Sequence, residues 1–264
     1  MKKKLITFCL LMLGIIIFSA CDSQVKYSEN VIKEGETKEV ESKEVEDNKL
    51  LEGGGLIFTF DDGCSTDYEV VYPILKEKGL EAVTYISPIF IEDEMDGFMD
   101  WEQVKALDEA GWDIEDHTYS HVNLEELTKE EINKEMQKIN DIFEKKGLDT
   151  PKHHALPYGE YNETAKEVVL TYRDTVRTAE NNLNSYPLED DILDAVDMGI
   201  HSEEVLKGFI DRAVLENKVL IFFTHDVQEN PYDYGITTEK FESVLEYAIE
   251  KEINILTLSE LMKY

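Results

Sequence analysis

The 264-residue sequence is poor in cysteine, in tryptophan and in positive charge. Its three cysteines leave no pair for a disulfide inside a folded domain, because Cys9 and Cys21 lie in an N-terminal leader-like segment and only Cys64 remains. The 26 basic residues are outnumbered by 58 acidic ones, and the formal charge is −32 at pH 7. Such a chain is repelled by nucleic acid and by anionic wall polymers, so we expect neither as a partner.

The chain also lacks a glycine-rich phosphate loop, an internal repeat and a long hydrophobic run. Its apolar run, Leu5 to Phe18, has 14 residues and follows three lysines, whereas a membrane-spanning helix needs roughly 20. Phe18-Ser19-Ala20-Cys21 then resembles the end of a bacterial lipoprotein signal. We therefore expect residues 1–21 to be a signal that ends at a lipidated Cys21. Ordinary cleavage with secretion, or an uncleaved anchor, remains open.

Residues 22–52 differ in composition from the rest of the chain. Glu and Lys dominate, no aromatic residue comes after Tyr27, and no apolar period is sustained. Such a segment cannot bury enough surface to offset its ordering entropy, so we expect a solvated tether. Residues 53–264 suit one catalytic domain, which we expect to be a monomer held at the extracytoplasmic face of the cell membrane by the lipid on Cys21.

In the domain, short apolar runs alternate with longer amphipathic ones. The expected strands are Gly55–Phe60, Ala82–Ser87, Trp112–Glu115, His153–Leu156, Asp174–Thr178, Ile192–Met198, Lys218–Thr224 and Asn254–Leu256. The expected helices are Thr66–Lys78, Trp101–Ala110, Thr128–Lys146, Glu160–Leu170, Ser202–Glu216, Thr238–Lys251 and Leu258–Lys263. This alternation predicts an α/β fold with a parallel sheet, and seven or eight such units favour a distorted (β/α) barrel.

Five polar segments lie at the ends of these expected strands. They are Thr59-Phe60-Asp61-Asp62-Gly63, His117-Thr118-Tyr119-Ser120-His121, Leu156-Pro157-Tyr158-Gly159, Asp194-Ala195-Val196-Asp197 and Phe223-Thr224-His225-Asp226. Because the carboxyl ends of parallel strands share one edge, we expect the segments to converge there. A carboxylate and two histidines suffice for a three-ligand metal site with an open position. A second carboxylate and a third histidine remain to move protons.

The candidate proton-transfer groups are one of two adjacent acids, Asp61 or Asp62, and His225. Asp-Gly after a strand is usually just a turn, but two adjacent acids are less usual. Side chains alternate along a strand, so one acid would point away, whereas in a turn both can face one cavity. One could then bind a cation while the other stays free as a base. His225 ends an apolar strand, which suggests proton transfer unless it only bonds to Asp226.

His117 and His121 are the candidate metal ligands. Their i, i+4 spacing would place both imidazoles on one face of a helical turn, as in many zinc sites. Asp116 beside them either supports these ligands or is a solvated acid. Cys64 is either a further zinc ligand or, in our preferred interpretation, a small turn residue.

Taken together and in this order, the five segments closely resemble the polysaccharide deacetylase family, the NodB homology domain of carbohydrate esterase family 4. The resemblance covers about Gly53 to Tyr264. Its specific motifs are Thr-Phe-Asp-Asp-Gly with His-Thr-x-x-His, and three connecting stretches also fit: Tyr72-Pro73-Ile74-Leu75-Lys76, Gly111-Trp112-Asp113-Ile114 and Thr257-Leu258-Ser259-Glu260-Leu261. The resemblance implies a divalent metal, foremost Zn²⁺ with Co²⁺, Ni²⁺ or Mn²⁺ as alternatives. Its ligands would be Asp62, His117 and His121.

The resemblance also implies the remaining roles. Asp61 would be the general base that deprotonates water, and His225 the general acid for the leaving group. Tyr158 would donate its backbone N–H to the oxyanion. Phe223 would lie near the acetyl methyl group of the substrate.

Two positions depart from the family pattern. Where many members have an Arg two residues before the Pro of the third segment, this chain has Ala155, and Arg177 after the next strand could orient Asp61 instead. A merely solvated or salt-bridged Arg177 is the alternative. The Trp usual near the fourth segment is missing, although Asp194 or Asp197 could still orient His225. We interpret the remaining histidines of the domain as structural: His153, His154 and His201.

The leading functional hypothesis is metal-dependent removal of acetyl groups from N-acetylglucosamine units of a cell-envelope or extracellular polysaccharide. An O-acetyl esterase, for example on xylan, could use the same groups. A degenerate carbohydrate-binding lipoprotein is the non-enzymatic alternative, motivated by Ala155 and the missing Trp.

Overall fold

The protein is described from a computed structural model, which covers residues 52–263. The expectations for the signal, for Cys21 and for nearly all of the tether lie outside these residues. Within 52–263, no helix is both long and apolar enough to span a membrane.

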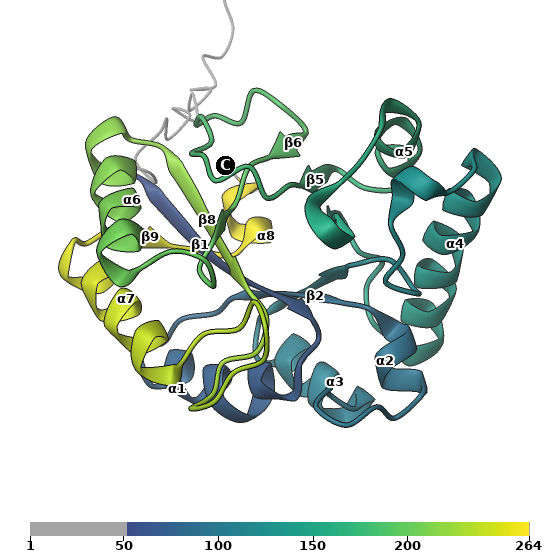
Figure 1. The fold of residues 1–264 in the computed structure, drawn as a ribbon, viewed down its shortest axis with the longest axis horizontal. Coiled ribbons are helices and arrows are strands. Elements are labelled where there is room, and N and C mark those ends of the chain that lie inside the picture. The colour runs from purple at the N-terminus through teal and green to yellow at the C-terminus, as the bar shows by residue number, and fades with distance from the viewer. Residues whose placement is uncertain (1–51, 264) are drawn as a thin grey trace, which may run out of the picture. The chain divides into compact units, whose positions relative to one another are not determined.

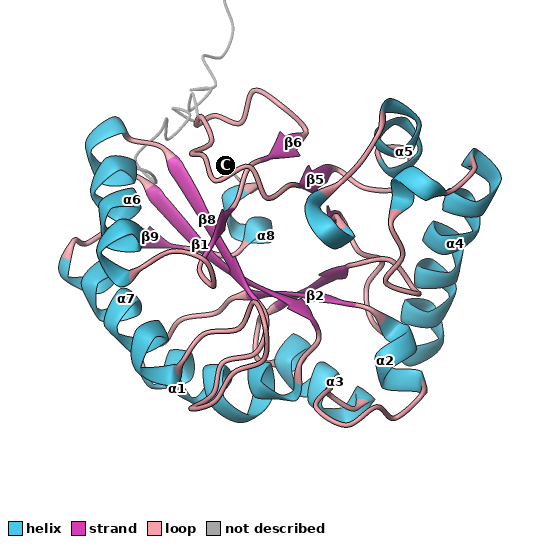
Figure 2. Ribbon diagram, viewed as in Figure 1, coloured by secondary structure: helices cyan, strands magenta, loops and turns pink. Residues whose placement is uncertain are grey.

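A single curled sheet, in which every strand pairing is parallel, forms the centre of the domain (Figure 2). The strands are β1 (Gly55–Asp62), β2 (Val83–Ile86), β3 (Asp113–Asp116), β4 (His153–Ala155), β5 (Thr175–Arg177), β6 (Ile192–Leu193), β7 (Val196–Asp197), β8 (Val219–Thr224) and β9 (Asn254–Ile255). Their order is β6-β5-β4-β3-β2-β1-β8-β7, with β9 added to β1. The expected distorted barrel is thereby confirmed, and it is open between β6 and β7.

Most of the helices cover the outside of this sheet, whereas α8 lies against its inner side (Figure 1). They are η1 (Asp67–Val71, π-helical), α1 (Tyr72–Glu77), α2 (Pro88–Glu92), α3 (Trp101–Glu109), η2 (Leu124–Glu126), α4 (Lys129–Lys146), η3 (Pro157–Gly159), α5 (Glu163–Val169), α6 (Glu203–Glu216), α7 (Thr238–Glu250) and α8 (Leu258–Leu261). The long helix α4 matches the expected range Thr128–Lys146: it begins at a capping box of Thr128 and Glu131 and ends at Gly147, which has φ 80°. Helix α2 was not expected.

The segment Ile192–Met198 is the main error in the expected strands. It forms two short strands, and these lie at opposite ends of the strand order, with β6 on β5 and β7 on β8. Asn184 breaks the segment, because its amide accepts a bond from Asp194 N (2.8 Å) and donates one to Asp194 O (2.8 Å). The chain itself therefore bridges the open side of the barrel.

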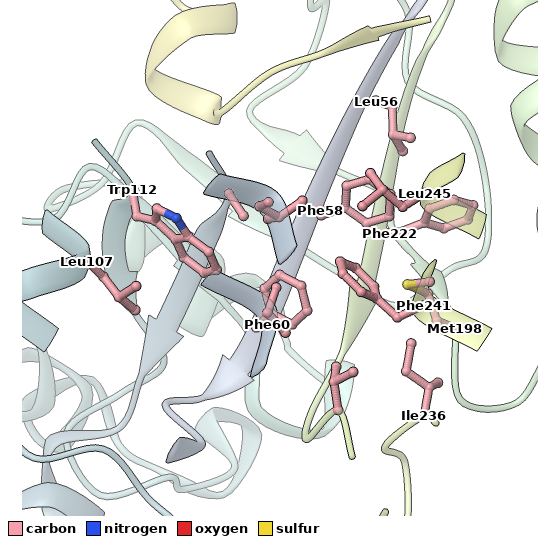
Figure 3. Close-up of a cluster of buried hydrophobic side chains, with 14 of the residues drawn as sticks. Leu56, Phe58, Phe60, Leu107, Trp112, Met198, Phe222, Ile236, Phe241 and Leu245 are labelled. Atoms are coloured by element: carbon pink, nitrogen blue, oxygen red, sulfur yellow. The ribbon is translucent and has the colours of Figure 1, made fainter. Parts of the chain in front are cut away.

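Successive side chains of β1 point to opposite faces of the sheet and belong to two different hydrophobic clusters. Leu56, Phe58 and Phe60 pack outward with α-helical residues such as Phe241 (Figure 3). Ile57 belongs to a second cluster inside the barrel, together with residues of α8. The next inward positions along β1 are 59 and 61, so the period of two directs Asp61 into the barrel.

Candidate active site

Adjacent acids at the end of β1 reach the same cavity through a change in backbone conformation. Asp61 is 3% exposed and follows the inward period of the strand. Asp62 would point outward in a regular strand, but it has a left-handed φ of 75°. Both side chains line a cavity of about 720 Å³. The structure thus brings together the two acids as the turn argument predicts.

The loop after β3 carries both histidines, and it is not helical. The helical-turn expectation is wrong, since Thr118 and His121 have left-handed φ values of 61° and 50°. The buried Asp116 carboxylate accepts the Thr118 N–H at 2.7 Å and so fixes this turn. The rings nevertheless converge, with centroids 5.1 Å apart. The i, i+4 spacing therefore singled out two residues whose rings do converge, although the local structure is not a helical turn.

His117, His121 and Asp62 form a group whose ligand atoms all lie within 4.8 Å of one another. From the Asp62 Oδ1 atom, Nε2 of His121 is 3.1 Å away and Nε2 of His117 is 3.5 Å away. The group does not include Cys64, which is buried in the turn and whose thiol has its pKa raised by burial. Cys64 as a further ligand is thus unsupported.

The tautomer of His117 fits a cation. Its Nδ1 lies 2.8 Å from the carbonyl oxygen of Ala155, and a carbonyl can only accept, so Nδ1 carries the proton. Nε2 then presents a lone pair toward the Asp62 carboxylate. Burial also lowers the pKa of His117 to about 4, which keeps the ring neutral. A lone pair facing a carboxylate is repulsive unless a cation lies between them, so the donor set fits a divalent metal.

Electrostatics at Asp62 point the same way. Burial alone would raise its pKa, but the neighbouring histidines, His121 foremost, lower it to about 2. Asp62 is therefore a carboxylate over the neutral pH range. An ionised carboxylate with neutral imidazoles is the ligand state that Zn²⁺ and similar ions require.

Arg177 holds one oxygen of Asp61 and leaves the other free. Its Nη2 donates to Oδ2 at 2.6 Å, while Oδ1 is buried without a hydrogen-bond partner. The guanidinium lies over the Phe223 ring, 4.6 Å from its centroid, and 5.3 Å from that of Tyr85. It is buried with Asp61, so this is not a solvated surface pair.

The register of the sheet explains how Arg177 reaches this place. Ala155 on β4 is paired directly with Arg177 on β5. A small residue at 155 leaves space at the level where the next strand can extend a long side chain across the barrel. Ala155, which stands where many family members have an Arg, therefore lies next to Arg177, the residue that contacts Asp61.

His225 follows β8 and faces the same cavity, with Nε2 3.9 Å from the Asp62 Oδ2 atom. Its Nδ1 is buried without a partner. Neither Asp194 nor Asp197 orients it as we expected: Asp194 Oδ1 accepts from Thr178, and Asp197 Oδ1 accepts from Gly199 N at 2.6 Å. Asp197 does line the cavity.

Asp226, the other expected partner of His225, bonds elsewhere, to Gln228 and Tyr232. Its carboxylate therefore shapes the loop that follows β8 and does not orient the ring of His225.

Tyr158 and Phe223 complete the lining. Tyr158 has a left-handed φ of 64°, and its ring stands edge-on to that of His121 at 5.0 Å. Phe223 is buried, forms part of the barrel interior and provides an apolar wall. Backbone strain at Tyr158 agrees with a position set by function rather than by local preference.

Two buried supports of the histidine loop were missed or left open by sequence reasoning. Asp116 is not a solvated acid: Arg173 Nε donates to its Oδ2 at 2.9 Å, and His154 Nδ1 lies 3.2 Å away. Glu135 on α4 accepts Ser120 N at 2.9 Å and Ser120 Oγ at 3.1 Å. The signal available in the sequence for Glu135 was an acid on the apolar face of an amphipathic helix, between Ile132 and Ile139.

The remaining histidines bond away from the cavity. His153 contacts Thr175, and His201 contacts Asn181. His154 contacts Asp116. These contacts agree with the interpretation that all three histidines are structural.

Comparison with known proteins finds one family. Residues 51–173 match the family model described as polysaccharide deacetylase. The Bacillus subtilis (strain 168) protein YxkH, provisionally named a polysaccharide deacetylase, is 32% identical over 108 residues, which cover 41% of this chain and 38% of YxkH.

Two solved structures agree with this match. The Streptococcus pyogenes deacetylase PplD, solved in complex with acetate, superposes with a TM-score of 0.50 at 25% identity over 53% of this chain and 62% of that chain. A CE4 family pseudoenzyme of Bacillus anthracis gives a TM-score of 0.57 at 16% identity over 79% of this chain and 65% of its own. The latter shows the fold alone.

The match spans less than two thirds of the length of each of these three proteins. The motif order and the curled parallel sheet agree with this match: residues 51–173 of the chain are similar to the polysaccharide deacetylase family.

Proposed function

We propose that this protein is a metal-dependent hydrolase that removes acetyl groups from N-acetylglucosamine units of a cell-envelope or extracellular polysaccharide. One observation carries the proposal: Asp62, His117 and His121 surround one point of a cavity that also holds a free oxygen of Asp61 and the ring of His225. The three ligands leave coordination positions open to solvent and substrate, as catalytic sites require.

In the proposed mechanism, the metal, foremost Zn²⁺, would polarise the acetyl carbonyl and lower the pKa of water from about 15.7 toward 7. Asp61 takes the proton of the attacking water on Oδ1, while Arg177 keeps Oδ2 engaged. The water oxygen bonds to the acetyl carbon, and the backbone N–H of Tyr158 stabilises the oxyanion. His225 protonates the leaving nitrogen as the C–N bond breaks, and acetate and an amine result.

Acetate and amine, measured together, test this reaction. We expect acetate release from N-acetylglucosamine oligomers or peptidoglycan with an equal number of new free amines. Acetate from acetylated xylan with unchanged amines on the glucosamine substrates would show an O-acetyl esterase instead. Metal binding without acetate from any of these substrates would favour the non-enzymatic alternative, for which a pseudoenzyme of this fold is a precedent.

We also propose that Cys21 is lipidated and holds the enzyme at the extracytoplasmic membrane face. The lipobox-like Phe18-Ser19-Ala20-Cys21 supports this, and two acyl chains anchor stably where one is marginal. Cys21→Ala should move the protein to the medium or leave an unprocessed precursor. Unchanged processing and location in that variant would exclude a lipid anchor.

A further inference from the structure

Three tyrosine rings gather around the mouth of the cavity. Among residues 52–263, the aromatic side chains that are more than half exposed are Tyr158 (65%), Tyr232 (73%) and Tyr234 (63%). All three line the cavity that contains Asp62 and His225. Exposed aromatic surface confined to one cavity indicates a ligand with an apolar face, because scattered exposure would be expected otherwise.

The loop that carries Tyr232 and Tyr234, residues 227–237, is anchored to Asp226. The buried carboxylate of Asp226 accepts Tyr232 N at 3.0 Å, and the Ile236 N–H donates to Asp226 O at 3.0 Å. Gly235 packs so closely on Asp226 that a side chain there would collide with it. Such anchoring lowers the cost of ordering the loop when a ligand binds. We call Tyr232, Asp233 and Tyr234 the tyrosine platform.

The platform lies on the His225 side of the metal group. The ring of Tyr234 is 5.8 Å from that of His225, and the ring of Tyr158 is 5.0 Å from that of His121. A sugar whose acetyl group lies between Asp62 and His225 thus has aromatic walls on both sides. Its neighbour along a glycan chain would meet the platform, where the C–H face of a pyranose can stack on tyrosine.

Acidic side chains at the rim of the cavity favour a positively charged sugar. Asp96 and Asp233 are exposed and line the cavity, and no ion pair or hydrogen bond engages their carboxylates in the described part of the chain. In that same part, the lining contains one basic residue, Arg177, which is buried and paired with Asp61. Outside the proposed metal group and its histidines, the mouth therefore attracts a cation and, among residues 52–263, offers no free Lys or Arg side chain to an anion.

We propose that the tyrosine platform is a subsite for a glucosamine unit whose amino group is already free. Tyr232 and Tyr234 take the sugar face, and Asp233 takes the ammonium. The inference rests on the proposed deacetylase function and deepens it: the preferred substrate is a partly deacetylated, cationic chain, deacetylated next to a free amine.

Binding of a tetramer of glucosamine, which carries no acetyl group and is not turned over, tests this directly. Calorimetric titration of metal-loaded enzyme in mildly acidic buffer should show binding that weakens with salt. Asp233→Asn should weaken it about threefold, the scale of an exposed ion pair. Tyr232→Ala should weaken it by about three- to tenfold, and Tyr232→Phe should retain it. Asp190→Asn, which alters an exposed acid outside the cavity lining, should change nothing.

The proposal is overturned if the tetramer does not bind, or binds Tyr232→Ala and Asp233→Asn as tightly as the parent. It is also overturned if N-acetylglucosamine tetramer binds the inactive Asp61→Asn protein more tightly than glucosamine tetramer does. Failure of the deacetylase function is a separate result, seen as absent acetate release while glucosamine binding persists.

Discussion

At the scale of single residues, Asp61 and Asp62 are neighbours in the chain but have different partners. Asp62 faces two histidines, and Asp61 faces Arg177. The left-handed backbone of Asp62 makes this division possible, since a regular strand would turn one acid out of the barrel. The proposed metal ligand and the proposed base are therefore separate groups, as the proposed mechanism requires.

In the proposed mechanism, Arg177 is a positioning residue. Arg177→Ala removes the donor to Asp61 Oδ2, so turnover should fall by about tenfold or more while metal content stays at the parent level. Because loss of a buried partner can also unfold the protein, Arg177→Lys, which keeps the charge but not the planar fork, should fold and recover part of the activity. Parent-like turnover in both variants would show that Asp61 works without a cationic partner.

At the scale of elements, the loop between β3 and η2 owes its shape to side chains from elsewhere. Asp116 fixes Thr118, and Glu135 reaches from α4 to Ser120. The positions of His117 and His121 thus depend on a helix that contributes nothing to the cavity lining.

Glu135→Gln tests this dependence. The amide loses one acceptor for the two Ser120 donors, so zinc affinity should fall by about tenfold, as for other supports of metal ligands. Competition with a chromogenic chelator measures it. Glu144→Gln changes an exposed acid on the same helix and serves as the control. Equal affinity in both variants would mean that the loop holds its shape without Glu135.

The same loop shows what sequence can and cannot predict. Strand ends and motif order placed the histidines, the acids and Arg177 at one edge, because parallel strands share a direction. The i, i+4 spacing could not reveal two left-handed residues, which depend on the Asp116 carboxylate. Likewise Ile192–Met198 has the pattern of one strand, and only the contact with Asn184 divides it.

At the scale of the whole molecule, burial couples stability to pH. His153 is buried, with Nδ1 2.9 Å from Thr175 Oγ1 and Nε2 without a partner. Burial lowers its pKa from 6.5 to about 4. Below pH 6.5 the unfolded chain binds a proton at His153, whereas the folded protein binds it only near pH 4. This group therefore lowers the free energy of unfolding as the pH falls through that range.

The expected size is about 3 kcal/mol between pH 6.5 and 4. His153→Asn keeps a polar partner for Thr175 but does not titrate, so its unfolding free energy should lose that part of the pH slope. Buried acids such as Asp67 and Glu115, whose pKa values are raised by burial, oppose the effect in both proteins and cancel in the difference. Parallel denaturation curves across this range would contradict the assignment.

The account as a whole depends on a metal whose ligands are distinct from the catalytic base. The most direct measurement is metal bound per chain, determined together with acetate release, for the parent, Asp61→Asn and His117→Ala. We predict one divalent metal and acetate release in the parent, an unchanged metal content without turnover in Asp61→Asn, and loss of both in His117→Ala. A parent without metal, or an Asp61→Asn protein that loses its metal, would contradict the account.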